Sequence, residues 1–372
     1  MLKVLHCYKT YYPDTFGGIE QVIYQLSEGS LNHGIESTVF TLSRKAAILD
    51  DKIANHSIYR VKKDFEIAST PFSFSAISKF KKIANDADII HYHFPYPFMD
   101  FMHFAANIKK PSVLTYHSDI VRQGNLLKIY SPLMYTFLDK VNAIVASSPN
   151  YVKTSCVLDK YKSKVSIIPF GLDPNFYKEQ SKHSYDKWKK YFPAGFFLFV
   201  GAFRYYKGLQ FLIDAAMNCS YPVVIVGTGP IEYELKEQAR KKNIKNVFFV
   251  GAVNDEDKKA LISLCTAVIF PSHLRSEAFG ISLLEGALYS KPLISCEIGT
   301  GTTYINIDKQ TGIVVKPGDS GGLRNAMDTI WYNPELAKNL GNGAFTRFNK
   351  LFTAERMVND YVSLYRSILL KR

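Results

Sequence analysis

Ser276-Glu277-Ala278-Phe279-Gly280-Ile281-Ser282-Leu283-Leu284-Glu285 is the stretch that decides how this chain folds. It follows an apolar run from Thr266 to Pro271, which predicts a buried strand, and its second half predicts the start of a helix. The first N–H groups of a helix have no partner within the helix, so this turn is a candidate anion site. Glu277 precedes the turn and Glu285 lies further along the helix, which places a carboxylate on each side of that site.

Short apolar runs alternate with helical patterns along the whole chain. This alternation predicts parallel sheets covered by helices on both faces, hence an α/β protein with two doubly wound domains in tandem. The predicted strands are Val4–Cys7, Ser37–Leu42, Ile89–Tyr92, Val113–Tyr116, Ala143–Ala146 and Val165–Pro169, then Phe196–Val200, Val223–Val226, Val247–Val250, Ala267–Phe270, Leu293–Ser295 and Ile313–Val315. Ligands of such sheets bind at the carboxyl ends of the strands, so two sheets facing each other would form a two-substrate site.

The break between the two predicted domains lies near residue 174. The stretch from Asn175 to about Pro193 is polar and charged, which makes it the candidate linker. The tail, Glu355–Leu370, has apolar side chains at helical spacing and predicts one more amphipathic helix.

Composition indicates a globular protein with an anionic partner. Of the 372 residues, 47% are hydrophobic, and the formal net charge is +13. Such a charge favours a nucleic acid, a nucleotide or an anionic membrane, although a solvated basic surface explains it as well, and no RNA-binding pattern of aromatic and basic residues is present. The five scattered cysteines suit free thiols in a reducing cytosol. No apolar run is long enough to span a membrane, and the N-terminus does not resemble a signal peptide.

Further candidate ligand-binding residues follow predicted strands. Gly17-Gly18 stands before the first predicted helix, where paired glycines let the backbone approach a diphosphate; an ordinary tight turn is the alternative. Arg204 and Lys207 follow the strand that ends at Val200, and two cations there would neutralise a diphosphate leaving group; a solvated loop is the alternative.

Gly227-Thr228-Gly229-Pro230 resembles part of a dinucleotide fingerprint, but Glu232 stands where the third glycine belongs. A nicotinamide dehydrogenase is therefore disfavoured.

Three histidines lie at the ends of predicted strands. His91 and His93 favour a structural role, whereas His117 favours a role in the ligand site as a donor to a substrate hydroxyl. No pair of histidines or cysteines has the spacing of a zinc motif.

The pair Glu277 and Glu285 has several interpretations. Two carboxylates suit the acid and base of a glycosidase, and Glu277 could simply cap the helix that begins at Gly280. The cations Arg204 and Lys207 favour a phosphate leaving group instead, which needs no general acid. The combination suggests an enzyme that handles a phosphate-linked sugar.

These motifs together resemble a known family. Glu277-x7-Glu285 with Phe279-Gly280, the Arg204/Lys207 pair, Gly17-Gly18 and Ile168-Pro169-Phe170-Gly171-Leu172-Asp173 are similar to the motifs of retaining GT-B glycosyltransferases of family 4, over nearly the whole chain. The stretch Ser295–Thr302 adds a likeness to bacterial O-antigen mannosyltransferases that use GDP-mannose, although Glu297–Asn306 lacks the Gly-Gly often found there in the family.

The resemblance implies a GT-B fold, with two Rossmann-like domains facing across a cleft and a C-terminal helix that returns to the N-terminal domain. The predicted acceptor domain then comprises 1–174 plus the returning helix 353–372, and the predicted nucleotide-sugar domain comprises 175–352.

The resemblance also implies a role for each matching residue. Glu277 and His117 would be catalytic: Glu277 beside the donor sugar, as an orienting group or a covalent nucleophile, and His117 in contact with sugar and acceptor. Glu285 would hold the ribose hydroxyls, cations and backbone N–H groups would hold the diphosphate, and no metal or other cofactor would be needed. The residues assigned to the donor are Gly17, Gly18, Arg204, Lys207, Phe279, Gly280, Ile281 and Glu285.

The implied reaction moves mannose from GDP-mannose to a glycan, expected on a polyprenyl diphosphate in O-antigen biosynthesis. Other nucleotide sugars (GDP-rhamnose or a UDP-sugar), a sugar-nucleotide epimerase and a non-catalytic nucleotide-sugar binding protein remain as alternatives. The expected location is the cytoplasm, with peripheral contact at the inner membrane. The apolar segment Leu126–Leu138, between basic residues, is the candidate for contact with an anionic membrane, and a core helix is the alternative.

Overall fold

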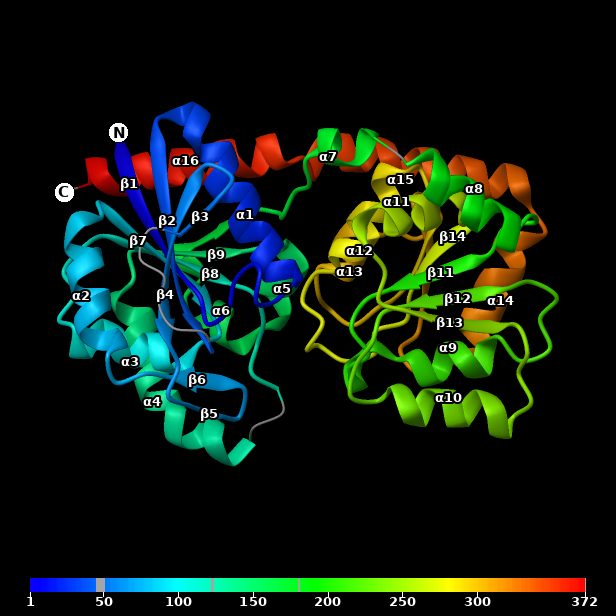
Figure 1. Cartoon of the computed structure of the whole chain (residues 1–372), viewed down its shortest axis with the longest axis horizontal. Coiled ribbons are helices and arrows are strands. Elements are labelled where there is room, and N and C mark those ends of the chain that lie inside the picture. The colour runs from blue at the N-terminus through cyan, green and yellow to red at the C-terminus, as the bar shows by residue number, and fades with distance from the viewer. Residues whose placement is uncertain (45–50, 122–123, 180, 372) are drawn as a thin grey trace. The chain divides into compact units, whose positions relative to one another are not determined.

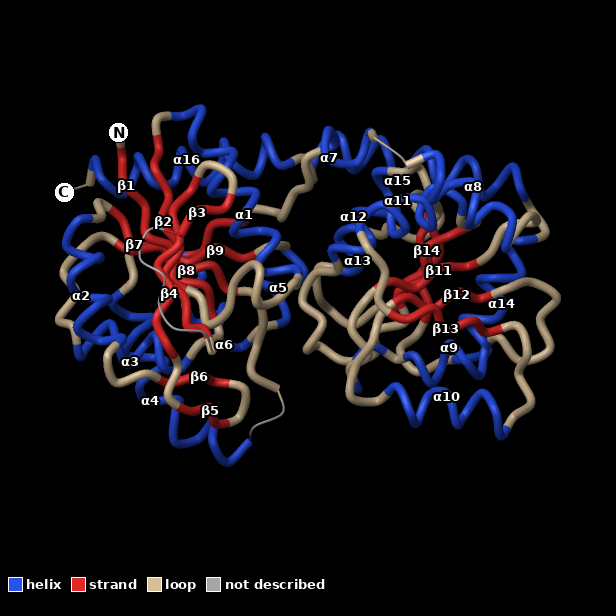
Figure 2. Tube along the Cα trace, viewed as in Figure 1, coloured by secondary structure: helices blue, strands red, loops and turns tan. Residues whose placement is uncertain are grey.

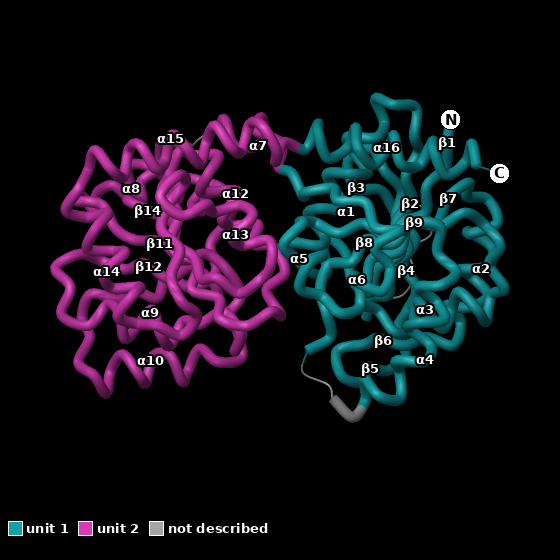
Figure 3. Tube along the Cα trace, turned by 180° about the vertical axis from the view of Figure 1, so that it is seen from behind, with its two compact units in different colours: residues 1–171, 354–372 teal, residues 172–353 magenta. Residues whose placement is uncertain are grey.

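The computed structural model describes residues 1–44, 51–121, 124–179 and 181–371, and divides the chain into two compact units (Figures 1 and 3). Unit 1 comprises Met1–Gly171 and Ala354–Arg372, and unit 2 comprises Leu172–Thr353. The predicted boundaries of 174 and 353 differ from these by a few residues. In each unit the strands form a central layer with helices on its faces (Figure 2).

Unit 1 contains an eight-stranded sheet in the order β10-β9-β8-β7-β1-β2-β4-β3. Its strands are β1 (Leu2–Cys7), β2 (Ile35–Ser43), β3 (Asp51–Ile53), β4 (His56–Lys62), β7 (Ile89–Phe94), β8 (Ser112–Tyr116), β9 (Ala143–Ala146) and β10 (Val165–Ile167). All pairs are parallel except β3 with β4. The central strands are buried on both faces, which explains why most of their residues are apolar or aromatic. A separate hairpin, β5 (Phe65–Ile67) and β6 (Thr70–Phe72), lies between β4 and α2 in the chain.

The helices of unit 1 are α1 (Gly18–Ser30), α2 (Ala76–Asp86), α3 (Pro97–Ala105), α4 (Gly124–Lys140), α5 (Pro149–Thr154), α6 (Cys156–Lys160) and α16 (Ala354–Leu370). The predicted tail helix is confirmed as α16, which packs against α1 (Figure 1). Gly29 permits this approach, because a Cβ there would lie 2.6 Å from a Val358 methyl group.

Unit 2 contains a parallel six-stranded sheet in the order β13-β12-β11-β14-β15-β16. Its strands are β11 (Phe197–Val200), β12 (Val223–Val226), β13 (Val247–Gly251), β14 (Ala267–Phe270), β15 (Leu293–Cys296) and β16 (Gly312–Val315). Its helices are α7 (Pro174–Lys178), α8 (Lys182–Tyr191), α9 (Leu209–Ala215), α10 (Glu232–Lys241), α11 (Asp255–Leu264), α12 (Ile281–Leu288), α13 (Thr302–Ile305), α14 (Ser320–Trp331) and α15 (Pro334–Leu351).

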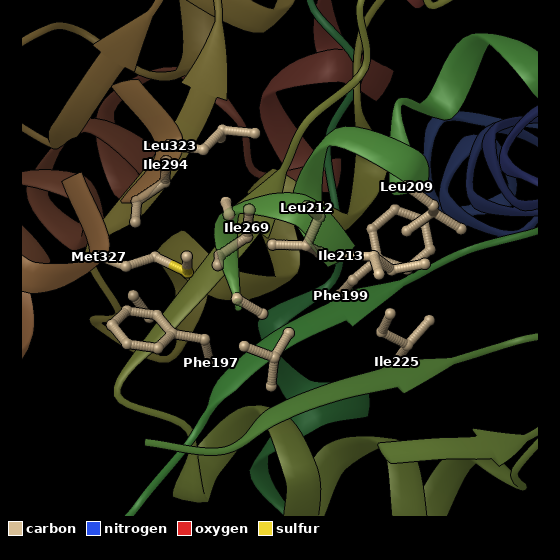
Figure 4. Packing of buried hydrophobic residues seen from close by; sticks show 14 of the residues in the cluster. Phe197, Phe199, Leu209, Leu212, Ile213, Ile225, Ile269, Ile294, Leu323 and Met327 are labelled. Atoms are coloured by element: carbon tan, nitrogen blue, oxygen red, sulfur yellow. The ribbon is translucent and has the colours of Figure 1, made fainter. Parts of the chain in front are cut away.

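The core of unit 2 packs one face of this sheet against α9 and α14. Phe199, Leu212 and Met327 belong to this core and are not exposed to solvent (Figure 4). This packing fixes where β11 and β14 end, and therefore where the loops that follow them begin.

The prediction of a linker at 175–193 is wrong for the described residues. Asp173 and Ser181 cap α7 and α8 through their side chains, and Trp188 of α8 donates to Asp257 of α11 at 2.8 Å. The segment is therefore part of unit 2; Gln180 lies outside the described residues.

Candidate active site

Two loops of unit 2 meet at the carboxyl ends of β11 and β14. Gly208 has φ +71°, and a Cβ there would overlap the carbonyl oxygen of Pro271. The N–H of His273 donates to the carbonyl of Tyr206 at 3.0 Å, which joins the loops through their backbones. Glycine is required at position 208 because of its left-handed backbone and because a side chain would collide with Pro271. Without a side chain at this position, the two loops can come into contact.

This contact pairs Lys207 with Glu277. The Lys207 ammonium donates to the Oε2 atom of Glu277, and the Ser272 hydroxyl donates to the same oxygen at 3.2 Å. Both charged side chains keep about an eighth of their surface exposed, 13% and 12%. A cation of the kind that binds phosphate and a carboxylate of the kind that binds hydroxyl groups are thus held side by side.

The turn after Glu277 shapes the start of α12. Gly280 adopts φ +104° as its N-cap, where no side chain caps the helix, and Phe279 is buried. Gly301 approaches so closely that a Cβ would overlap the Phe279 ring, and its N–H donates to the Ala278 carbonyl at 2.8 Å. The backbone of Phe279, Gly280 and Ile281 is therefore held in place at a helix N-terminus, a position whose free N–H groups generally favour anions.

Glu285, one turn into α12, is buried and already has partners. The Tyr177 hydroxyl donates to its Oε1 atom at 2.8 Å, and the Lys258 ammonium lies 3.0 Å from the same atom. Burial alone would lower the pKa of Lys258, but the carboxylates of Glu285 and Asp255 outweigh it and raise the pKa. Lys258 and Tyr177 thus fix Glu285 in its orientation.

Arg204 is exposed in the loop after β11, next to the 3-10 turn Tyr205–Lys207. The fingerprint-like glycines Gly227 and Gly229 have a packing role beside it, because a Cβ on either would overlap a backbone oxygen of the 201–203 segment. This accounts for the two glycines without a dinucleotide.

Gly17 and Gly18 are exposed at the N-terminus of α1 in unit 1. Gly17 is the N-cap, in extended backbone, and no side chain caps the helix. The buried carboxylate of Glu20 in the first turn accepts hydrogen bonds from the hydroxyls of Thr10 and Thr15, at 3.1 and 2.6 Å.

His117 follows β8 in unit 1 and is 4% exposed. Its Nε2 atom lies 3.0 Å from Nδ1 of His93, and its ring stacks on Phe170 at 5.2 Å. Burial lowers the pKa of His117 to about 3, so the ring is neutral at physiological pH.

His6, His91 and His93 form a group with ring nitrogens within 4.8 Å of one another, a spacing that could hold a metal. Hydrogen bonds engage these nitrogens: His6 with His93 at 3.1 Å, and His91 with Tyr365 and Thr115 at 2.6 and 2.7 Å. Burial lowers the pKa of each of the three rings, that of His6 to about 3.

Among the predicted site residues, Gly17, Gly18 and His117 belong to unit 1 and the others to unit 2. Three supporting residues were not predicted from the sequence: Tyr177, Lys258 and Ser272. No local pattern marks them, because each reaches its partner through the tertiary fold.

Sequence comparison defines the class to which this site belongs. Residues 16–176 match Glycosyltransferase Family 4, and residues 183–347 match Glycosyl transferases group 1. The chain belongs to the GT-B glycosyltransferases of family 4, and its two doubly wound units are the two Rossmann-like domains of that fold.

Two relatives are similar over almost their full length. The chain is 52% identical to O-antigen chain mannosyltransferase C of Escherichia coli, covering 99% of both chains. It is 51% identical to D-rhamnosyltransferase WbpZ of Pseudomonas aeruginosa, covering 95% of this chain and 93% of that one. Among solved structures, sucrose-phosphate synthase of Thermosynechococcus elongatus shares the fold with a TM-score of 0.83, at 19% identity and full coverage of both chains.

Proposed function

We propose that this glycosyltransferase moves mannose from GDP-mannose to a saccharide acceptor with retained configuration. The acceptor we propose is a polyprenyl-diphosphate-linked glycan of O-antigen biosynthesis. The observation behind the proposal is the Lys207–Glu277 pair beside the start of α12, in a chain 52% identical to an O-antigen mannosyltransferase.

In the proposed reaction, the bond between C1 of mannose and the β-phosphate oxygen breaks while the acceptor oxygen bonds to C1 on the same face. The acceptor proton passes to the departing phosphate. Lys207, Arg204 and the N–H groups at the start of α12 stabilise the charge that develops on the diphosphate. Glu277 orients the sugar or forms a transient bond to it, and His117 hydrogen-bonds sugar and acceptor.

GDP-D-rhamnose is the second donor to test, because a D-rhamnosyltransferase is almost as similar to this chain as the mannosyltransferase. D-rhamnose is mannose without its 6-hydroxyl, so the two donors differ in one group. Thermal shift with GDP, UDP and their sugars ranks affinity, because a ligand of the native state raises its stability by mass action. Preference for a UDP-sugar would contradict the proposal.

Transfer itself is tested with GDP-mannose and a short glycan on a synthetic polyprenyl diphosphate. NMR of the product should show an α-mannoside; a β-product would contradict retention. Conversion of the donor to another sugar nucleotide without acceptor would indicate an epimerase, and binding without turnover would indicate a binding protein.

We propose that the reaction needs no metal, because Arg204 and Lys207 already supply two cations in the loop after β11. Transfer should then continue in EDTA at the rate seen with Mg²⁺ or Mn²⁺. Loss of activity in EDTA, restored by one of these ions, would contradict this part of the proposal.

We also propose that unit 1 contacts an anionic membrane through an exposed apolar surface, here called the aromatic rim. The ring of Phe65 lies between those of Phe74 and Phe72, with centroid distances of 5.9 and 5.1 Å. The Phe72 ring also contacts Phe98 of α3. The rim consists of Phe65, Ile67, Phe74, Phe101, Leu126 and Ile129. Phe74 and Ile129 are 79% and 80% exposed, which suits insertion into a lipid interface.

The predicted membrane segment Leu126–Leu138 divides along α4. Phe137 and Leu138 are buried in the core, whereas Leu126 and Ile129 are exposed beside the exposed Lys128. No helix within the described ranges is long and apolar enough to cross a bilayer. The proposed contact is therefore at the membrane surface, with lysines near anionic headgroups.

Vesicle sedimentation tests the aromatic rim. Phe74→Ser and Ile129→Ser should reduce binding to phosphatidylglycerol vesicles, while the matched control Tyr233→Ser, 75% exposed on α10, should not. Equal binding by all variants, or no preference for anionic over phosphatidylcholine vesicles, would contradict the proposal.

A further inference from the structure

Four buried histidines lie on one face of the unit 1 sheet. His6 on β1 pairs in register with His91 on β7, and His93 lies two residues further along β7. His93 pairs with Thr115 on β8, and His117 lies two residues beyond Thr115. Because side chains alternate along a strand, these positions share a face, and all four rings are at most 4% exposed.

Three of these rings form a hydrogen-bonded chain that ends at His117. Nδ1 of His6 lies 3.1 Å from Nε2 of His93, and Nδ1 of His93 lies 3.0 Å from Nε2 of His117. Burial keeps all three rings neutral, by lowering their pKa values, so each has one N–H donor and one acceptor nitrogen.

A chain of neutral imidazoles has only two consistent arrangements of its protons. If every N–H points toward His117, that residue has its proton on Nδ1 and offers a donor with its remaining nitrogen. If every N–H points away, His117 has its proton on Nε2 and Nδ1 is an acceptor. The tautomer of His117 is therefore tied to the tautomers of His93 and His6.

His91 holds this chain in place from the side. Its ring stacks on His93 with centroids 4.3 Å apart, and its nitrogens bond to the hydroxyls of Tyr365 and Thr115. Thr115 in turn lies 2.7 Å from the hydroxyl of Tyr361. Two tyrosines of α16 thus fix the rings from the C-terminal helix, and this set of hydrogen bonds leaves a metal at His6, His91 and His93 the less favoured interpretation.

We propose that His93 is a positioning residue that orients His117 and selects its tautomer, with His6 extending this control through the chain. This rests on the proposed function, in which His117 hydrogen-bonds sugar and acceptor. No proton leaves the chain; it sets whether His117 presents a donor or an acceptor to a substrate hydroxyl.

Two substitutions at His93 separate the two hydrogen bonds of that ring. In His93→Asn the amide lies near the former Nδ1 position and can keep the bond to His117. In His93→Gln the amide lies near the former Nε2 position and keeps only the bond to His6. We expect kcat of His93→Asn to stay within a few-fold of the wild type and kcat of His93→Gln to fall about 10- to 100-fold, with the donor KM unchanged in both.

Nitrogen NMR of the His117 ring gives a readout that does not depend on turnover. Nε2 should show a hydrogen bond in the wild type and in His93→Asn, and lose it in His93→Gln. If the wild type transfers sugar from none of the donors tested, the proposed function is wrong. The NMR comparison of the wild type with the two His93 variants would still show whether His93 orients His117.

Several results would overturn the proposal. These are an unchanged kcat in His93→Gln, equal losses in both variants with a raised KM, or a Zn²⁺-dependent rise in Tm of the wild type that both variants lose. If His93→Gln does not fold, His6→Asn and His6→Gln repeat the comparison one ring further, since Nδ1 of His6 makes the bond to His93.

Discussion

The two sheets of this chain end in groups of opposite character. In unit 2, charged side chains with partial exposure, Lys207 and Glu277, meet in loops that glycine holds together. In unit 1, neutral buried rings lead to His117 through hydrogen bonds. Charge is suited to holding a diphosphate, whereas neutral rings discriminate hydroxyls by the direction of a hydrogen bond. Variants of unit 2 should therefore change the binding of the charged diphosphate, and variants of unit 1 should change the orientation of a bound hydroxyl group.

The largest expected effect is at the ion pair of unit 2. Lys207→Ala removes a cation from the proposed diphosphate site. The Glu277 carboxylate then keeps the hydrogen bond from Ser272 but loses the one from the Lys207 ammonium. We expect kcat to fall about 100- to 1,000-fold, as for loss of one group that stabilises transition-state charge. The measurement is initial rate of transfer at saturating donor.

Lys236→Ala is the control, because Lys236 of α10 also pairs with a glutamate, Glu232, but is 52% exposed. It should retain the wild-type rate, since exposed pairs of this kind contribute little. A wild-type rate for Lys207→Ala would show that the charged end of unit 2 is not the donor site.

The sequence alone indicated the chemical types at this site but not their pairing. Glu277 and Lys207 were both predicted as site residues, and each follows a strand as expected. Their contact depends on the approach of Gly208 to Pro271, which joins loops remote in sequence and leaves no local pattern. For the same reason a structural role was predicted for His91 and His93, and the hydrogen bond between His93 and His117 was not predicted.

Some helices and strands were missed because they are little buried, and others because they are very short or have polar residues at buried positions. In α8 only Ser184 and Trp188 are buried, so no apolar stripe distinguishes this helix from a charged linker. The strands β3, β5 and β6 are three residues each and were missed, because so short a run shows no period. The seven-residue strand β4 was missed as well, because the polar residues His56 and Arg60 occupy buried positions in it. Strands such as β9 and β14 were predicted because burial on both faces makes them continuously apolar.

A smaller effect is expected from the glycine that joins the loops. Gly208→Ala forces alanine into a left-handed backbone and also produces a clash with Pro271. The control Gly251→Ala has the left-handed backbone, at φ +73°, but no clash, because open space surrounds this position. The control should lose about 1–2 kcal/mol of stability, and Gly208→Ala about 1–3 kcal/mol more. Chemical unfolding of both variants measures the difference.

Donor affinity distinguishes the two glycine variants further. Gly208→Ala should also weaken GDP binding, because displaced loops separate Lys207 from Glu277, while Gly251→Ala should not. Equal stability and equal affinity in the two variants would show that the loop contact is not what holds the charged site together.

A last difference between the two units is their expected sensitivity to acid. His6 and His117 have pKa values of about 3 in the native state, against about 6.5 when unfolded. Between these values the unfolded chain binds more protons, so stability is complete above pH 6.5 and falls as the pH drops toward 3. Each of these histidines contributes a loss of about 1.4 kcal/mol per pH unit. Amide exchange measured at pH 7.5 and pH 5 should therefore show β1, β7 and β8 losing protection before β11 and β14. Equal acid sensitivity of the two sheets would mean that the buried imidazoles already accept protons in the native state, and the neutral chain that distinguishes unit 1 from unit 2 would have to be abandoned.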